Sequence, residues 1–376
     1  MKSKVVNILK RNNNLFKTIS FLKGIVFDFK YRILSLKWNS NHNFFIDIAN
    51  HQKSNLNRNL SIIWCGINEN QDRSGLIQGL EKNFNLEIFY RPNKEYGLTN
   101  NSFYDLKSIN KNGELLYNYL KVKSELSQVD YLFGQFMGVN INTYWLEKIQ
   151  KLGIKIISLS WDDKLVNLWG KDYKLSCHSI SHHIDYLLCS SIEPIKAYTN
   201  TNAFFFPLGS YDKVFSGDPY SKKTIDVLFI GNQYGARKSY IDFLIKNKIN
   251  IEFYGMDWGT EFLSFTECAQ KFKQAKIIIG IGYVSHSSKI TTLKLRDFDA
   301  SISGALYLTT RNKELEKLFP NNEIEFYESK NELLKKITFY LENDTKRIEK
   351  ASKLQKFTMN NFSWDILFKK LNSYLS

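Results

Sequence analysis

Short apolar runs alternate with helical segments through the first half of the chain. After a polar stretch at residues 51–59, the run at residues 60–66 (LSIIWCG) ends in a turn signal and predicts a buried strand. A helix follows, with Leu76, Ile77 and Leu80 on one side. Further strands are predicted at residues 86–90, 131–133, 155–159 and 184–189, with helices at residues 74–84 and 144–151. Strands separated by helices predict a parallel sheet with right-handed crossovers.

The alternation starts again after a loop-like stretch at residues 216–223 (SGDPYSKK), which marks a domain boundary. Strands are predicted at residues 226–231, 250–254, 276–281 and 305–308, with helices at residues 239–246, 265–274 and 293–303. A chain of 376 residues also exceeds what one core usually supports. We expect an α/β fold with two Rossmann-like, doubly wound domains (56–216 and 217–355) facing an interdomain cleft. Residues 356–376 are expected to form a helix that packs back across the domains.

Residues 1–55 are expected to form a helical extension with a basic, amphipathic character. Apolar residues recur there at steps of three and four, at Phe16, Ile19, Leu22, Val26, Phe29, Ile33 and Leu36. Basic residues lie between them, at Lys17, Lys23, Lys30, Arg32 and Lys37. Two interpretations stay open for this helix or pair of helices. It packs on its own domain, or it lies on an anionic membrane surface.

The net charge of +15 predicts a surface that attracts anions. Because the excess is scattered lysine without an arginine-rich or glycine-rich block, nucleic acid is not the expected partner. The four cysteines, Cys65, Cys177, Cys189 and Cys268, show no C-x-x-C spacing and favour a reducing cytoplasm over a disulfide framework. The sequence shows no signal-peptide pattern and no run of about 20 uncharged apolar residues.

Three loops after predicted strands of the second half carry candidate binding residues. Gly231 begins a glycine-containing loop that enters a helix at Arg237 and Lys238, a combination suited to a diphosphate. A polar loop with His286 and Lys289 follows the strand at residues 276–281. A glycine-stopped helix then places Arg296 and Asp299 on one face, and a carboxylate can accept hydrogen bonds from both hydroxyls of a ribose. Tyr254 follows a strand where a nucleotide base could rest. Each feature also has an ordinary structural interpretation. The basic pair after Gly231 can be a solvated helix start, and the loop with His286 can be an ordinary surface loop. Arg296 and Asp299 can be an exposed ion pair, and Tyr254 can be a core aromatic.

Carboxylates and histidines follow or precede strands of the first half. Asp162 and Asp163 are the preferred candidates for a general base, ahead of Asp72 and Glu69. They can equally cap the next helix. Among His178, His182 and His183, we select His183 as a candidate for acceptor contact. No H-E-x-x-H arrangement occurs, so no metal site is predicted.

The second half resembles the C-terminal domain of the CgeB-like, group 1 glycosyltransferases. The resemblance lies in LKLRDFDASISGALYLT, ELEKLFPNNEIEFYESKNELLKKITFYLEN and the terminal FTMNNFSWDILFKKL. It is similar to the family's R-x-F-E, small-residue, glycine and strand pattern. More loosely, IISLSWDD at residues 156–163 and FPLGSYDKVF at residues 206–215 resemble first-half and interdomain segments of the family. Residues 1–55 lie outside the resemblance.

This resemblance implies a GT-B fold, with residues 56–216 on the acceptor side and residues 217–355 binding a nucleoside-diphosphate sugar. It implies that Arg237 and Lys238 neutralise the diphosphate, Asp299 holds the ribose, and Arg296 assists the phosphates or fixes Asp299. No metal or other cofactor is expected. Two positions depart from the family pattern, because Asp299 replaces a glutamate and Thr291 stands where the first glutamate of an E-x7-E pair belongs.

The sequence therefore predicts a cytoplasmic glycosyltransferase acting on a glycan, lipid-linked glycan or protein. Peripheral contact with an anionic membrane through the N-terminal helix is part of this hypothesis. A non-catalytic GT-B-shaped binding module is one alternative, and it would bind a donor without turnover. A basic nucleic-acid-binding protein is the other, and it would show steeply salt-dependent affinity for RNA or DNA.

Overall fold

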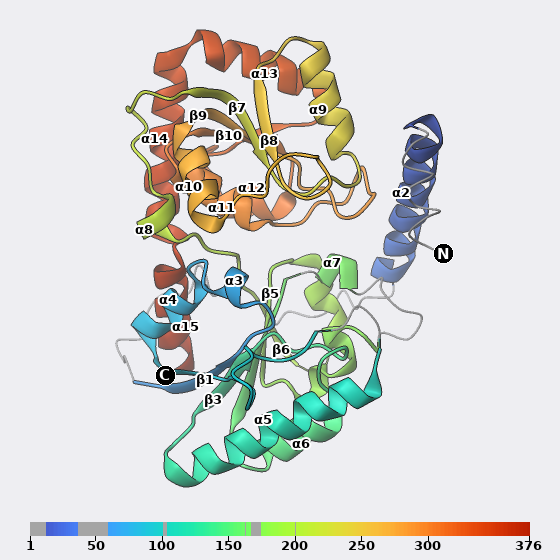
Figure 1. Cartoon of the computed structure of the whole chain (residues 1–376), viewed down its shortest axis with the longest axis vertical. Helices are drawn as coiled ribbons and strands as arrows, with labels where there is room; N and C mark the ends of the chain where they lie inside the picture. The colour runs from blue at the N-terminus through green and yellow to red at the C-terminus, as the bar shows by residue number, and fades with distance from the viewer. Residues whose placement is uncertain (1–12, 37–58, 101–103, 162, 167–173, 200) are drawn as a thin grey trace. The chain divides into compact units, whose positions relative to one another are not determined.

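The computed structural model describes residues 13–36, 59–100, 104–161, 163–166, 174–199 and 201–376. These residues form two compact units, each built on one parallel sheet flanked by helices (Figure 1). The five-stranded unit takes in helix α2 (Asn13–Leu36) and Gly217–Leu354. The six-stranded unit takes in the described residues between α2 and Ser216, together with Gln355–Ser376. The predicted α/β class, with two Rossmann-like sheets and an N-terminal helix, is confirmed.

The sheet of the six-stranded unit has the order β2-β1-β3-β4-β5-β6. Its strands are β1 (Ser61–Cys65), β2 (Asn85–Ile88), β3 (Tyr131–Gly134), β4 (Lys155–Ser160), β5 (Tyr186–Cys189) and β6 (Asn202–Phe205). Each neighbouring pair is parallel. The strand order reverses between β1 and β3, so the topological switch point of this sheet lies where those two strands end.

The helices of this unit are α3 (Glu69–Asp72), α4 (Leu76–Asn83), α5 (Leu106–Leu126), α6 (Thr143–Gln150), α7 (Asp163–Val166), α8 (Asp212–Phe215) and α15 (Trp364–Leu375). Three short 3-10 turns, η2 (Cys177–Ser179), η3 (Ser181–His183) and η4 (Glu193–Ala197), complete it. The turns η2 and η3 precede β5, and η4 follows it.

The last helix of the chain, α15, packs on α4 and on the sheet of the six-stranded unit. Phe368 lies edge-on to Phe84 and Phe133, with ring centroids 6.4 and 6.2 Å apart, and 5.8 Å from Phe206. Lys82 of α4 forms an ion pair with Asp365. Phe133, Phe206 and Phe368 are almost completely buried, so the end of the chain is part of this unit's core.

The sheet of the five-stranded unit has the order β11-β10-β9-β7-β8. Its strands are β7 (Ile225–Ile230), β8 (Ile251–Tyr254), β9 (Ala275–Gly280), β10 (Leu306–Thr310) and β11 (Glu325–Tyr327). Its other helices are α9 (Arg237–Lys246), α10 (Phe265–Gln274), α11 (Leu295–Ile302), α12 (Lys313–Leu318) and α13 (Lys330–Glu342), and α14 (Asp344–Asn361) begins here. The strand order reverses between β7 and β9, which fixes the switch point of this sheet.

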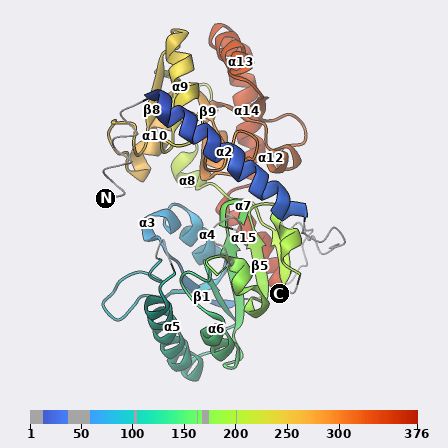
Figure 2. The same cartoon turned by 90° about the vertical axis from the view of Figure 1, so that its right-hand side faces the viewer.

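Helix α2 belongs to the five-stranded unit, and Figure 2 shows it as one unbroken helix. Its Gly24 approaches the loop after β9 so closely that an added Cβ would lie 2.4 Å from the His286 carbonyl oxygen. Asp28 accepts a hydrogen bond of 2.5 Å from the Ser287 hydroxyl. In the part of the chain that the structure describes, no helix is long and apolar enough to cross a bilayer.

Candidate functional site

Two arginine side chains meet at the switch point of the five-stranded sheet. Arg296 donates to the carbonyl of Ile230, where β7 ends, and to the carbonyl of Ile281, just after β9, at 3.5 Å. Arg237 donates to the same Ile281 carbonyl at 3.4 Å and to the Asn232 carbonyl at 2.8 Å. Both guanidinium groups therefore bridge the ends of the two strands between which ligands of such sheets bind.

The two guanidinium groups are buried. Arg237 is 5% exposed and Arg296 is 8% exposed, and among the described residues the Nε atom of each has no hydrogen-bond partner. Burial, followed by the charge of Arg296, lowers the pKa of Arg237 from 12.5 to about 10. That shift corresponds to about 3 kcal/mol against the charged form. An anion bound beside this pair would relieve the cost.

The local sequence explains how the pair is held. Both guanidinium carbons lie over the ring of Phe229 on β7, at 5.7 Å for Arg237 and 4.8 Å for Arg296. Gly231 is needed here because an added Cβ would lie 2.5 Å from Nη1 of Arg296. Arg237 is also the first residue of α9, whose N-terminus has no side-chain cap. The N–H groups of Arg237 and Ser239 already donate to the Tyr234 and Ala236 carbonyls, so the helix adds mainly the positive end of its dipole to the attraction for an anion.

Other residues predicted for this site lie around the pair in different ways. Lys238 points along α9 to Asp242, with which it forms an ion pair at 2.7 Å. Tyr254 ends β8, the neighbour of β7, and its hydroxyl donates to Glu252 at 2.6 Å. His286 is in the loop against α2, where burial and the charge of Lys23 lower its pKa. Lys289, in the same loop, is exposed.

Asp299 is half-buried on α11, one turn after Arg296. It lies close enough to Cys268 of α10 that its charge, after burial, helps to raise the pKa of that thiol to about 11. The structure thus brings Arg237 and Arg296 together, while Asp299 stands on the side of α11 near α10.

A buried carboxyl on α11 was missed by the sequence reasoning. Asp297 is 1% exposed, accepts from the Lys294 backbone N–H at 2.7 Å and accepts a short hydrogen bond from the Tyr307 hydroxyl on β10. Burial raises its pKa, while the charge of Arg296 acts in the opposite direction. Asp297 therefore anchors α11 to the sheet and helps to place Arg296. Its position in the run LKLRDFD gives no signal that distinguishes it from Asp299.

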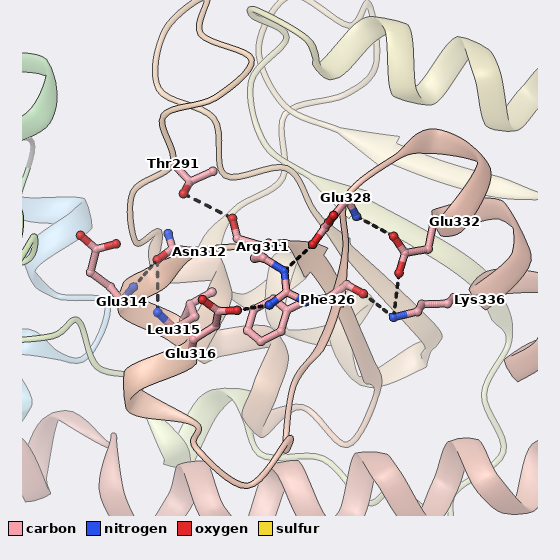
Figure 3. A network of polar contacts seen from close by, with 10 residues as sticks. All are labelled: Thr291, Arg311, Asn312, Glu314, Leu315, Glu316, Phe326, Glu328, Glu332 and Lys336. Atoms are coloured by element: carbon pink, nitrogen blue, oxygen red, sulfur yellow. Dashed lines mark hydrogen bonds and ion pairs between the residues drawn. The ribbon is translucent and has the colours of Figure 1, made fainter. Parts of the chain in front are cut away.

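Thr291, at the position of the missing glutamate, lies next to an acidic network after β10 (Figure 3). Its hydroxyl donates to the Arg311 carbonyl at 3.4 Å. The Arg311 guanidinium pairs with Glu328 at 2.8 Å and also with Glu316. Arg311 is 54% exposed and its charge is matched by two carboxylates, in contrast to the buried pair at the switch point.

The six-stranded unit has a buried carboxyl at its own switch point. Asp72 is fully buried after β1, accepts from the Tyr96 hydroxyl at 2.7 Å and accepts from the amide of Gln135, just after β3, at 2.8 Å. Burial raises its pKa from 3.8 to about 6, against the opposing effect of these hydrogen bonds. Such a pKa is suited to proton transfer near neutral pH.

The preferred first-half candidates are placed differently from Asp72. Asp162 lies outside the described residues. Asp163 is 1% exposed just after β4, and one of its oxygens accepts from Ser160 at 2.6 Å and from Tyr198 at 2.5 Å. Glu69, in contrast, is exposed and paired with Arg73 at 2.9 Å.

His183 lies at the amino ends of the strands of the same sheet, on the side opposite the other candidates. It precedes β5, and its Nδ1 contacts Gln150, which precedes β4, at 3.0 Å. Burial, followed by the neighbouring His182, lowers its pKa. It is not brought together with the carboxyl-end residues. Within the described ranges, no group of three or more His, Cys, Asp or Glu residues could hold a metal ion.

Comparison with known proteins gives a family match and structural matches. Residues 237–372 match a family described as glycosyl transferase-like, a segment that begins at Arg237 and includes Arg296. A glycosyltransferase from Rickettsia africae has a similar structure, with a TM-score of 0.56 and 11% identity over 85% of this chain and 98% of that chain. The Anabaena protein HepE, in complex with UDP and glucose, gives 0.54 and 10% over 84% and 99%.

Sucrose-phosphate synthase from Thermosynechococcus elongatus gives a TM-score of 0.54 and 10% identity over 83% of this chain and 97% of that chain. The chain has the GT-B fold. Comparison with curated protein sequences finds no match. The fold and the family match of the five-stranded unit's sequence thus point to the same class of proteins, the glycosyltransferase-like proteins.

Proposed function

We propose that this GT-B protein transfers a hexosyl group from a nucleoside-diphosphate sugar to a glycan, a lipid-linked glycan or a protein. The observation that carries the proposal is the buried pair of Arg237 and Arg296 at the switch point of the five-stranded sheet. Two adjacent guanidinium groups with unpartnered Nε atoms favour a ligand with closely spaced negative charges. The match to a glycosyl transferase-like family over the same segment supports a nucleotide sugar as that ligand.

In this proposal the arginine pair holds the diphosphate and stabilises the charge that develops when the sugar leaves. Preorganised donors aimed at developing charge typically contribute several kcal/mol to catalysis. Their burial strengthens the effect, since water screens them little. Because two fixed cations act on the leaving group, we propose that the reaction needs no metal ion.

The remaining donor-side residues are assigned by the resemblance and by their place in the five-stranded unit. We propose Gly231 for close approach of the backbone to the phosphates, Asp299 for the ribose and Tyr254 for the base. Lys238, His286 and Lys289 are proposed for phosphate and sugar oxygens. For Lys238 this requires the side chain to leave its exposed ion pair with Asp242, an exchange that costs about 1 kcal/mol or less.

A general base from the six-stranded unit completes the proposal. Asp163 and Asp162 are the residues proposed from the sequence. Asp163 would have to exchange a hydrogen bond from Ser160 or Tyr198 for one from the acceptor hydroxyl. Asp72 is a further candidate, because it lies at the switch point of its sheet and its pKa is raised to about 6.

The acceptor class and the location are proposed from the sequence motifs and the charge of the chain. The CgeB-like motifs favour that branch of the group 1 enzymes, and the basic charge favours an envelope polysaccharide or lipid-linked acceptor at the cytoplasmic face of a membrane.

The test is release of UDP, GDP or dTDP from the corresponding nucleoside-diphosphate sugars, and of CMP from CMP-sugars, with and without acceptor glycans. We expect one donor to be consumed, with the same rate when EDTA is present. Donor binding without release would identify a non-catalytic binding module. Absence of both binding and release for every donor would refute the proposal.

A further inference from the structure

One side of helix α2 packs on the five-stranded unit, and a second, apolar side is exposed among the residues that the structure describes. On the inner side Gly24 and Tyr31 are buried against the five-stranded unit, and Asp28 accepts from Ser287. The outer side consists of Phe21, Leu22, Ile25, Val26, Phe29, Ile33 and Leu36, which we call the outer face. At 3.6 residues per turn these positions cover an arc of about 140° opposite Gly24 and Tyr31.

The outer face is strongly exposed. Phe21 is 67% exposed, Phe29 63% and Leu36 78%, and the other four side chains are between 43% and 54% exposed. A helix that only packs on its own domain would carry polar residues at these positions. A contiguous apolar strip of this kind is typical of a surface that binds a partner or a membrane.

The charges of α2 distinguish a protein partner from a membrane as the ligand of the outer face. Lys23 and Lys30 are exposed beside the outer face and Arg32 is exposed within its arc, whereas Asp28, the one acidic residue of α2, faces Ser287. Two copies of the chain meeting through this face would bring like charges together. An anionic lipid surface is complementary to both features, because headgroups attract the basic side chains and the acyl boundary accepts the apolar ones.

We propose that α2 docks the protein on anionic membranes through the outer face. The helix lies in the plane of the headgroups, while its inner side stays bound to the loop that follows β9. That loop begins at the Ile281 carbonyl, which accepts hydrogen bonds from both arginines of the switch point. Docking by α2 therefore holds the five-stranded unit at the lipid surface. This inference does not depend on the proposed glycosyl transfer.

The experiment measures co-sedimentation of the full chain, without substrates, with vesicles of phosphatidylcholine alone or mixed with phosphatidylglycerol. We expect the native chain to bind the mixed vesicles preferentially. The double substitution Phe21→Ser and Phe29→Ser should weaken this binding about a hundredfold, since two phenylalanine side chains no longer enter the lipid. Lys23→Gln with Lys30→Gln should reduce the preference for phosphatidylglycerol about tenfold or more.

The matched control is Phe262→Ser, because Phe262 is 80% exposed in the same unit but outside α2. It should bind vesicles as the native chain does, and all variants should keep the native melting temperature, as their side chains are exposed. Failure of the native chain to bind either vesicle would overturn the inference. So would a dimer in light scattering that Phe21→Ser and Phe29→Ser dissociate, or a lowered melting temperature showing that the outer face is covered by the chain itself.

Discussion

Replacing Arg237 by methionine should separate the cost of the buried arginine pair from its use in binding. The lowered pKa of Arg237, about 10 instead of 12.5, corresponds to about 3 kcal/mol against its charge in the free protein. The substitution removes that cost and keeps most of the apolar volume. It also removes the donors to the Asn232 and Ile281 carbonyls, a loss of about 1–3 kcal/mol. The two effects oppose each other, so the ligand-free stability should change by no more than about 2 kcal/mol.

Nucleotide binding, in contrast, should weaken strongly. Loss of charge-assisted hydrogen bonds worth about 1.5–3 kcal/mol each should weaken affinity for the diphosphate about a hundredfold for Arg237→Met or Arg296→Met. The assay is thermal unfolding with UDP, GDP, dTDP or CMP. At about 100 times its dissociation constant, the preferred nucleotide should stabilise the native protein by roughly 2.7 kcal/mol. That corresponds to a rise of about 5–10 °C for a unit of about 150–250 residues.

Arg311→Met is the matched control in the same unit. Arg311 is exposed and already paired with Glu316 and Glu328, so its loss should leave the nucleotide-induced shift unchanged. The reasoning is refuted if Arg237→Met and Arg296→Met keep the native shift. It is also refuted if either variant loses about 3 kcal/mol or more without ligand, because the pair would then serve stability rather than binding.

Three further predictions concern single residues. Because the pKa of Asp72 is raised from 3.8 to about 6, the folded state binds more protons than the unfolded state between these values. The free energy of unfolding should therefore fall by up to about 3 kcal/mol as pH rises from about 4 to 6, and Asp72→Asn should abolish this dependence in urea titrations. Gly231→Ala should displace the guanidinium of Arg296, which lies 2.5 Å from the added Cβ, and should weaken nucleotide binding in calorimetry; unchanged affinity would contradict the close approach. Tyr307→Phe should lower stability by about 1–3 kcal/mol in chemical denaturation because the buried carboxyl of Asp297 loses its hydroxyl donor, and a neutral effect would show that this pair is not structural.

The sequence predicted the parts of the fold that depend on large apolar side chains. Buried strands such as β1, β7 and β9 each contain three or four consecutive apolar residues, so they stand out without any alignment. Helix α5 was missed, although it has 21 residues. Its buried side includes Asn112, which bonds to the backbone at Thr99 and Asn140, and Gly113, against which Trp145 packs. A helix that buries an amide and a glycine has little apolar periodicity to detect.

The candidate site was predicted in part for a similar reason. Arg237 follows β7 and Arg296 follows β9, and the doubly wound order makes these two strands neighbours in the sheet. The direction in which neighbouring side chains point cannot be read from spacing. Lys238 follows Arg237 directly but turns to Asp242, and Asp297 rather than Asp299 is the buried carboxyl of α11.

Helix α15 packs in the core of the six-stranded unit, and this has a consequence for folding during synthesis on the ribosome. Phe84, Phe133 and Phe206 of the six-stranded unit are made early, but the aromatic ring that packs on all three belongs to Phe368. Until the last residues leave the ribosome, this apolar surface faces water or a chaperone. The five-stranded unit, complete at Leu354, has all its residues available sooner. The half of the protein that is translated first is therefore the half that finishes folding last.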